Sequence, residues 1–137
     1  MHILLVQQSA PYGNSNAKEA LDIALTATTF EQDISILFTG DACYQLMANQ
    51  CPEHIDQKNI SQMLKALPIY GLEEVLVDEG SLQCRGIVNL TDSPNLKKVS
   101  KSEISERVGR MLEMVRLSGM GSRRPNELSG GQQQRVA

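Results

Sequence analysis

Short apolar runs alternate with segments of helical periodicity over most of this sequence. Strand-length apolar runs lie at 2–6, 33–39 and 74–77, with a weaker one at 87–90. Between the first two, apolar residues recur at helical spacing from 17 to 28. Strands that alternate with helices favour an α/β fold with a mainly parallel sheet. The run at 2–6 is apolar without a break, so we expect it to be a central strand that is buried on both faces.

Further helices are expected between and after these strands. Their predicted ranges are 42–49, 60–67 and, with a strongly amphipathic pattern, 102–117, while 81–84 is either a short helix or a turn. A loop rich in Gly and Arg follows the last of them. The resulting prediction is an α/β domain with a mainly parallel sheet, followed by a helical tail.

Charge divides the chain into two segments. Residues 1–98 carry six Lys and Arg against twelve Asp and Glu, a balance of −6, whereas residues 99–137 carry seven against four, a balance of +3. Arg85 is the single arginine of the first segment. A change this abrupt predicts two parts, a core domain at 1–98 and a tail at 99–137 that is not an independent domain.

Several classes of protein and site are not expected. No apolar run reaches the roughly 18 residues of a membrane span, and the N-terminus lacks the basic region of a signal peptide, so we expect a cytoplasmic protein without membrane contact. Three cysteines without a C-x-x-C pair favour neither a disulfide framework nor a zinc site. The sequence contains no G-x-G-x-x-G motif, so we predict no cofactor and no metal.

Two places could carry chemistry. Tyr12 and Gly13 follow the first strand, where parallel sheets collect ligands, although an ordinary turn explains them more simply. Cys84 precedes Arg85 and is the better candidate for a reactive thiol, while Cys43 begins a short helix that would also favour a thiolate. The simpler interpretation, three half-buried structural cysteines, is favoured.

The tail resembles part of an ABC-transporter ATPase. Its last ten residues read Leu-Ser-Gly-Gly-Gln-Gln-Gln-Arg-Val-Ala. In that family the signature residues, here Ser129, Gly130, Gly131 and Gln132, contact ATP held by the opposite subunit. A phosphate-binding Walker A loop needs a Gly-Lys pair, and none of the ten glycines is followed by Lys. We therefore expect a vestigial signature fragment that cannot hydrolyse ATP.

Residues 1 to about 97 resemble the DsrE/DsrF-like sulfur-relay family, most closely its TusC/DsrF branch. The matching pieces are short but agree in order and spacing. They are Ala10–Gly13, Glu19–Asp22, Asp33–Phe38, Gly40–Leu46 with Gln50, Leu64 with Tyr70-Gly71, and Ser81-Leu82-x-x-Arg85-Gly86. The resemblance implies a flavodoxin-like (DsrE-like), three-layer α/β fold with helices on both faces of the sheet. It also implies a cytoplasmic hetero-oligomer with TusD/DsrE-type and TusB/DsrH-type subunits. That complex passes persulfide sulfur toward 2-thiouridine at the tRNA wobble position, or serves sulfur oxidation in the Dsr branch. A homo-oligomer of the chain alone stays open, and direct contact with nucleic acid is not expected.

One departure from the family pattern decides the predicted role. In DsrE-type subunits the sulfur-carrying Cys lies eight residues before the Gly of the Arg-Gly pair, and here that position is Asp78. A carboxylate cannot carry a persulfide, so we expect a non-catalytic subunit. Tyr12, Gly13, Asp78, Arg85 and Gly86 are then candidates for interface or sheet-edge loop positions.

Two alternatives remain beside this interpretation. The chain could be a fragment of an ABC ATP-binding protein, or a thiol-dependent sulfurtransferase that uses Cys84. The family also closes its sheet with a final strand. Here the tail takes the place of that strand, so an open sheet edge or an exposed apolar patch is expected.

Overall fold

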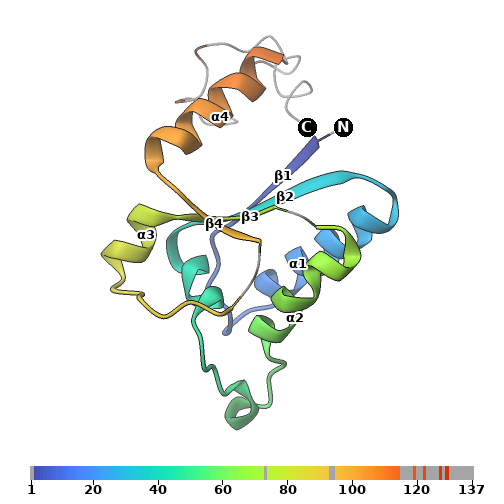
Figure 1. Cartoon of the computed structure of the whole chain (residues 1–137), viewed down its shortest axis with the longest axis vertical. Helices are drawn as coiled ribbons and strands as arrows, with labels where there is room; N and C mark the ends of the chain where they lie inside the picture. Colours follow the sequence, from blue (N-terminus) through green and yellow to red (C-terminus); the bar gives the residue numbers. More distant parts are fainter. Residues whose placement is uncertain are drawn as a thin grey trace. The chain divides into compact units, whose positions relative to one another are not determined.

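A computed structural model of the chain describes residues 2–72, 74–92 and 95–114 and, beyond these, residues 119, 122, 127 and 129. The chain divides into two compact units, Met1–Val99 and Ser100–Ala137. The first unit holds the whole sheet and most of the helical segments (Figure 1). The independent folding expected of a core domain at 1–98 stays a prediction.

Four strands form one parallel sheet in the order β1-β2-β3-β4. Their bounds are β1 His2–Gln7, β2 Asp33–Phe38, β3 Glu74–Asp78 and β4 Leu96–Val99. The register places Leu5, Ile36, Val75 and Leu96 in one row across the sheet. Because successive side chains of a strand point to opposite faces, Ile34, Phe38 and Val77, each two residues from this row, share its face, and all three are buried in the core. The predicted α/β fold with a parallel sheet is confirmed.

The helical segments of the first unit connect these strands. They are α1 Asn16–Thr29, η1 Gly40–Leu46, η2 Pro52–Ile55, α2 Ile60–Ala66, η3 Leu67–Tyr70 and α3 Glu79–Cys84, with η denoting 3₁₀ helices. In Figure 1, α1 and α2 lie on the same side of the sheet. Leu21 of α1 and Leu64 of α2 belong to the same buried cluster as Ile36 and Val75 of that face. The helical periodicity therefore buries its apolar stripe against the sheet, as predicted.

Two expectations about strands are wrong. The run at 2–6 is not a central strand: among the described strands β1 lies at the edge of the sheet, and Val6 is 49% exposed. The weak strand expected at 87–90 contributes only Leu90, which forms an isolated antiparallel bridge with Met47. The fourth strand is instead β4. Its two lysines, Lys97 and Lys98, interrupt the apolar run by which a strand is predicted from the sequence.

The helix expected at 42–49 is the 3₁₀ segment η1, which begins two residues earlier and ends at Leu46. Beyond its end, the side-chain amide of Gln50 donates to the Tyr44, Gln45 and Met47 carbonyls. Those contacts supply further donors to carbonyl groups at the C-terminal end of η1.

The second unit contains α4, Lys101–Met114. Ser100 and Glu103 cap it reciprocally: the Glu103 amide donates to Ser100 Oγ over 3.3 Å, and the Ser100 amide donates to Glu103 Oε2 over 2.8 Å. The predicted helix reaches 117, but residues 115–118 lie outside the described part of the chain. None of the described helices has both the length and the hydropathy needed to cross a membrane.

Candidate functional site

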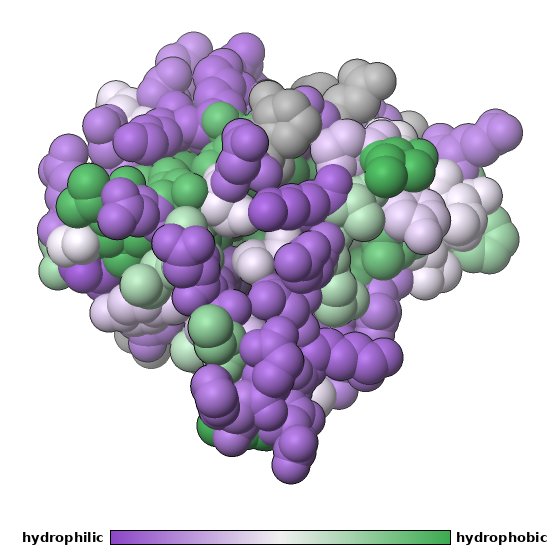
Figure 2. All heavy atoms as spheres, turned by 60° about the horizontal axis from the view of Figure 1, so that its bottom comes forward, coloured by the Kyte–Doolittle hydropathy of each residue, from purple (hydrophilic) through white to green (hydrophobic). Residues whose placement is uncertain are grey.

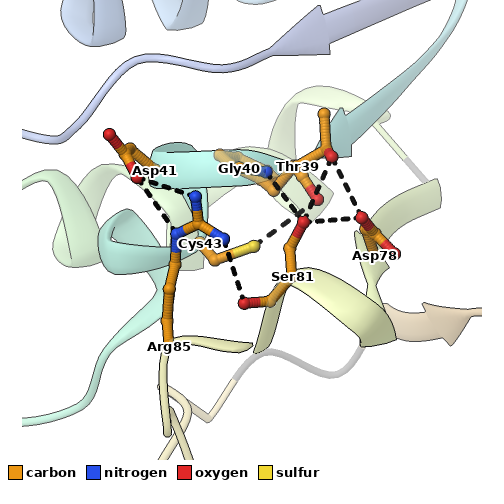
Figure 3. A network of polar contacts seen from close by, with 8 residues as sticks. Thr39, Gly40, Asp41, Cys43, Asp78, Ser81 and Arg85 are labelled. Carbon is orange, nitrogen blue, oxygen red and sulfur yellow. Dashed lines mark hydrogen bonds and ion pairs between the residues drawn. The ribbon is translucent and has the colours of Figure 1, made fainter. Parts of the chain in front are cut away.

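Asp78 is the centre of a polar network at the carboxyl ends of β2 and β3 (Figure 3). Its Oδ2 accepts hydrogen bonds from Ser81 Oγ at 2.6 Å and from Thr39 Oγ1 at 3.1 Å. Its Oδ1 accepts from the Gly80 amide at 3.1 Å, which makes Asp78 the N-cap of α3. Ser81 Oγ in turn accepts from the Gly40 amide at 2.9 Å. One carboxylate thus ties the ends of two strands to the start of a helix.

The network keeps Asp78 ionised. Partial burial raises the pKa of the carboxyl, but hydrogen bonds from Ser81, Thr39 and Gly80 outweigh burial and leave the pKa below its ordinary value. Each of these bonds uses the carboxylate as an acceptor. The arrangement anchors the loop, and it places a carboxylate rather than a thiol at the end of β3.

Arg85 joins α3 to η1. Its Nε and Nη2 both donate to Asp41 Oδ1, at 3.0 and 2.8 Å, and Nη1 donates to the Ser81 carbonyl at 3.3 Å. The hydrogen bond to Asp41 raises the pKa of Arg85 further. Gly86 follows with a φ of 62° and ends the helix. The predicted Arg-Gly pair and Asp78 therefore lie together at one end of the sheet.

Cys43 lies beside this network but is not an activated thiol. It is fully buried in η1, and burial raises its pKa to about 11 although the nearby Arg85 guanidinium acts in the opposite direction. The expectation that the start of a helix would favour a thiolate at Cys43 is wrong, because desolvation dominates. Cys84, the last residue of α3, is exposed, and so is Cys51.

Tyr12 and Gly13 line a separate hollow of about 640 Å³. The loop after β1 forms one wall, and the segment from Ile55 to Met63 forms the other. The Tyr12 hydroxyl donates to Gln50 Oε1 at 3.1 Å, and burial raises its pKa. Figure 2 turns the lower side of Figure 1 forward and shows hydrophilic residues over the centre of that face. The five predicted loop positions thus form two groups, with Tyr12 and Gly13 apart from Asp78, Arg85 and Gly86.

Sequence reasoning missed Thr39 and Ser81, which complete the network. A signal existed for both. Ser81 lies three residues after Asp78, the spacing at which an N-cap side chain meets the first helical turn. Thr39 directly follows β2, and adjacent parallel strands bring their carboxyl ends to the same edge.

Comparison with known proteins identifies the family. The model of the DsrE/DsrF-like family matches residues 1–118. The chain is 36% identical to the Protein TusC homolog of Aliivibrio fischeri over 103 residues, 75% of this chain and 87% of that protein. The chain belongs to the DsrE/DsrF-like family. A TusC homolog of Pseudomonas aeruginosa is also 36% identical, over 62% of this chain and 71% of that protein.

Two further proteins extend the comparison. The intracellular sulfur oxidation protein DsrF of Allochromatium vinosum is 37% identical over 61% of this chain and 62% of its own length. The crystal structure of the YchN protein of E. coli superimposes with a TM-score of 0.66 at 24% identity, over 77% of this chain and 89% of YchN. That likeness shows a shared fold.

The family match also bears on the tail. It extends past residue 98 and includes all of α4. Of the four signature residues of the ABC resemblance, Ser129 is described and exposed, whereas Gly130, Gly131 and Gln132 lie outside the described residues. Within the described part of the chain, no three His, Cys, Asp or Glu side chains gather as they would around a metal ion.

Proposed function

We propose that this chain is a non-catalytic, TusC/DsrF-type subunit of a cytoplasmic sulfur-relay complex. In this proposal it assembles with TusD/DsrE-type and TusB/DsrH-type subunits. The complex passes persulfide sulfur toward 2-thiolation of the wobble uridine of tRNA, and this chain supports the transfer without carrying sulfur itself.

The observation that carries the proposal is the use of Asp78. A subunit that carries sulfur needs a thiolate at the end of β3. Here that position holds a carboxylate whose two oxygens accept bonds from Ser81, Thr39 and the Gly80 amide. The position therefore has a structural role, and Cys43, the thiol of η1, is buried with a raised pKa.

The names of the relatives support the proposed role as a sulfur-relay subunit and the proposed TusC branch. Two relatives described above are called TusC homologs and one is called DsrF, an intracellular sulfur oxidation protein. The TusC relatives favour the branch that serves tRNA thiolation over the branch that serves sulfur oxidation.

Co-expression tests the assembly. The chain is expressed with TusD/DsrE-type and TusB/DsrH-type subunits and is separated by size-exclusion chromatography with mass detection. The proposal expects one hetero-oligomer of defined mass that contains all three chains. If neither the full chain nor residues 1–118 joins the other two subunits, the assignment as their partner is wrong.

Sulfur loading tests the non-catalytic role and the alternative that Cys84 carries sulfur. The assembled complex is treated with a small-molecule persulfide donor, whose sulfane sulfur moves to an attacking thiolate while the donor leaves as a thiolate. Intact-mass analysis should find the added sulfur on the TusD/DsrE-type subunit and not on this chain. Added sulfur on this chain that is lost in Cys84→Ser and kept in Cys51→Ser would establish the alternative instead.

A further inference from the structure

The 3₁₀ helix η1 connects the two groups of candidate positions. It begins at Gly40, whose amide belongs to the network around Asp78. It ends at Leu46, and Gln50, whose side chain holds that end, is bonded to Tyr12 beside the hollow. η1 has seven residues, whereas 3₁₀ helices rarely exceed about four because their hydrogen bonds are poorly aligned. Contacts from outside the helix are therefore needed to stabilise one of this length.

The backbone bonds at both ends of η1 are long. The Ala42 amide donates to the Thr39 carbonyl and the Met47 amide donates to the Tyr44 carbonyl, both over 3.3 Å. A typical N–H···O bond measures about 2.9–3.0 Å. At three residues per turn η1 makes only about two turns, so the loss of either end leaves about one turn intact. A helix this short has no interior that is independent of its ends.

Side chains of α3 hold the start of η1. The Gly40 amide donates to Ser81 Oγ at 2.9 Å, and Arg85 donates to Asp41 Oδ1 from Nε and Nη2, at 3.0 and 2.8 Å. Ser81 is in turn bonded to Asp78. Figure 3 shows these contacts gathered around the first turn of η1. The start of η1 is thus fixed by the same residues that form the candidate site.

One side chain holds the end of η1. Gln50 Nε2 donates to the carbonyls of Tyr44, Gln45 and Met47 at 3.1, 3.0 and 2.8 Å. Its Oε1 accepts from the Tyr12 hydroxyl at 3.1 Å. An amide side chain carries its acceptor and its donors on different atoms. The bond from Tyr12 to the oxygen therefore keeps the NH₂ group turned toward η1.

We propose that η1 couples the hollow at Tyr12 to the network around Asp78 by opening as one unit. A molecule that enters the hollow and separates Tyr12 from Gln50 then also loosens the pair of Asp41 and Arg85. Because coupling is reciprocal, a partner that draws Arg85 away from Asp41 loosens the wall of the hollow by the same factor. The coupling does not depend on the sulfur-relay function, since all of its contacts lie within residues 12–85 of this chain.

Hydrogen exchange of the full chain, resolved by residue, tests whether a change at the end of η1 reaches its start. Tyr12→Phe keeps the ring and removes only the hydroxyl that is bonded to Gln50. The Gly40 amide, at the opposite end of η1, should then exchange about threefold to tenfold faster. Tyr70→Phe makes the same chemical change at a side chain outside η1 that is 53% exposed, and it should leave the Gly40 amide unchanged.

The reverse direction needs a substitution at the start of η1. Asp41→Asn keeps the shape of the side chain and removes the charge that pairs with Arg85. The Met47 amide, at the opposite end, should then exchange faster. Asp22→Asn makes the same change at an exposed position of α1 and is the control. Faster exchange that stays confined to the substituted end of η1 would overturn the proposal, and so would unchanged exchange at both ends.

Two further residues separate the opening of η1 from unfolding of the whole chain. Cys43 is fully buried within η1, so its modification by iodoacetamide should speed up in both variants together with the amides. The amide of Leu21, which is fully buried in α1, reports unfolding of the core and should keep its rate. If the Leu21 amide accelerates as much as the Gly40 and Met47 amides, η1 does not open separately and the coupling is refuted. Other subunits are absent from these measurements, so the result is independent of the hetero-oligomer test.

Discussion

The carboxylate of Asp78 occupies the position where a sulfur-carrying subunit would hold a thiol, and its contacts make a measurable prediction. Asp78→Asn keeps the shape of the side chain but replaces one accepting oxygen by an NH₂ group. That group cannot accept hydrogen bonds from the Ser81 and Thr39 hydroxyls. We expect the free energy of unfolding to fall by about 1–3 kcal/mol, as is usual for lost hydrogen bonds to a charged group. Urea unfolding measures this, with Glu79→Gln, an exposed carboxylate of the same helix, as the near-neutral control.

The pH dependence of the same variant has a definite sign. The pKa of Asp78 in the folded chain lies below its ordinary value of 3.8. The carboxylate therefore contributes stability above that pH and loses its contribution as the pH falls through the lowered folded pKa. The stability difference between the unmodified chain and Asp78→Asn should shrink in acid. A difference as large at about pH 3 as at about pH 7 would contradict this account.

The three thiols should differ in reactivity. Cys51 and Cys84 are exposed, whereas Cys43 is buried with a pKa of about 11. Since the thiolate is the reactive form, iodoacetamide at about pH 8 should modify two cysteines in the native chain and the third only after unfolding. Peptide mapping assigns the sites, and Cys84→Ala should reduce the native count to one. Modification of native Cys43 at the rate of Cys51 would be incompatible with its buried position.

At the scale of elements, η1 depends on the backbone conformation of Gly40. This residue has a φ of 60°, and a Cβ atom there would lie 3.8 Å from Arg85 Nη2. Gly40→Ala should therefore lower the free energy of unfolding by about 1–2 kcal/mol, mainly through the left-handed backbone. Gly109→Ala is the matched control, because Gly109 lies inside α4 with open space around it and Ala there should raise helicity. Circular dichroism during urea unfolding reports both effects.

The elements also show what the sequence could predict. Periodicity located β1, α1, β2 and β3, because each buries an apolar face that repeats along the chain. It could not place β1 at the edge, since an apolar run looks the same with one neighbouring strand or with two, and the order of strands is set by tertiary packing. Periodicity did not predict β4, because Lys97 and Lys98, which are exposed at the edge of the sheet, interrupt its apolar pattern. At the site, the resemblance to the DsrE/DsrF-like family pointed to Asp78 and Arg85, whereas the contacts that Thr39 and Asp41 make depend on how the strand ends meet in three dimensions.

For the whole molecule, charge and contacts divide the chain at nearly the same place. The balance changes from −6 to +3 after residue 98, and the compact units meet at Val99 and Ser100. The first unit has a buried core to which both α1 and α2 contribute side chains. Most described side chains of α4 are exposed. A segment with little buried apolar surface opens at low free-energy cost. The two units should therefore differ in resistance to a protease.

Limited trypsin digestion of the full chain measures that difference. Lys65 of α2 and Arg110 of α4 are both exposed basic residues on helices, so they form a matched pair within one molecule. Cleavage needs local unfolding of the helix that holds the site. Because α2 buries Ile60 and Leu64 in the core, cleavage at Arg110 and at Lys101 should precede cleavage at Lys65, leaving a product that ends near residue 101. Intact-mass analysis over time gives the order of cuts. If the first cuts fall within the first 98 residues while the tail stays protected, the core domain does not fold independently of the tail.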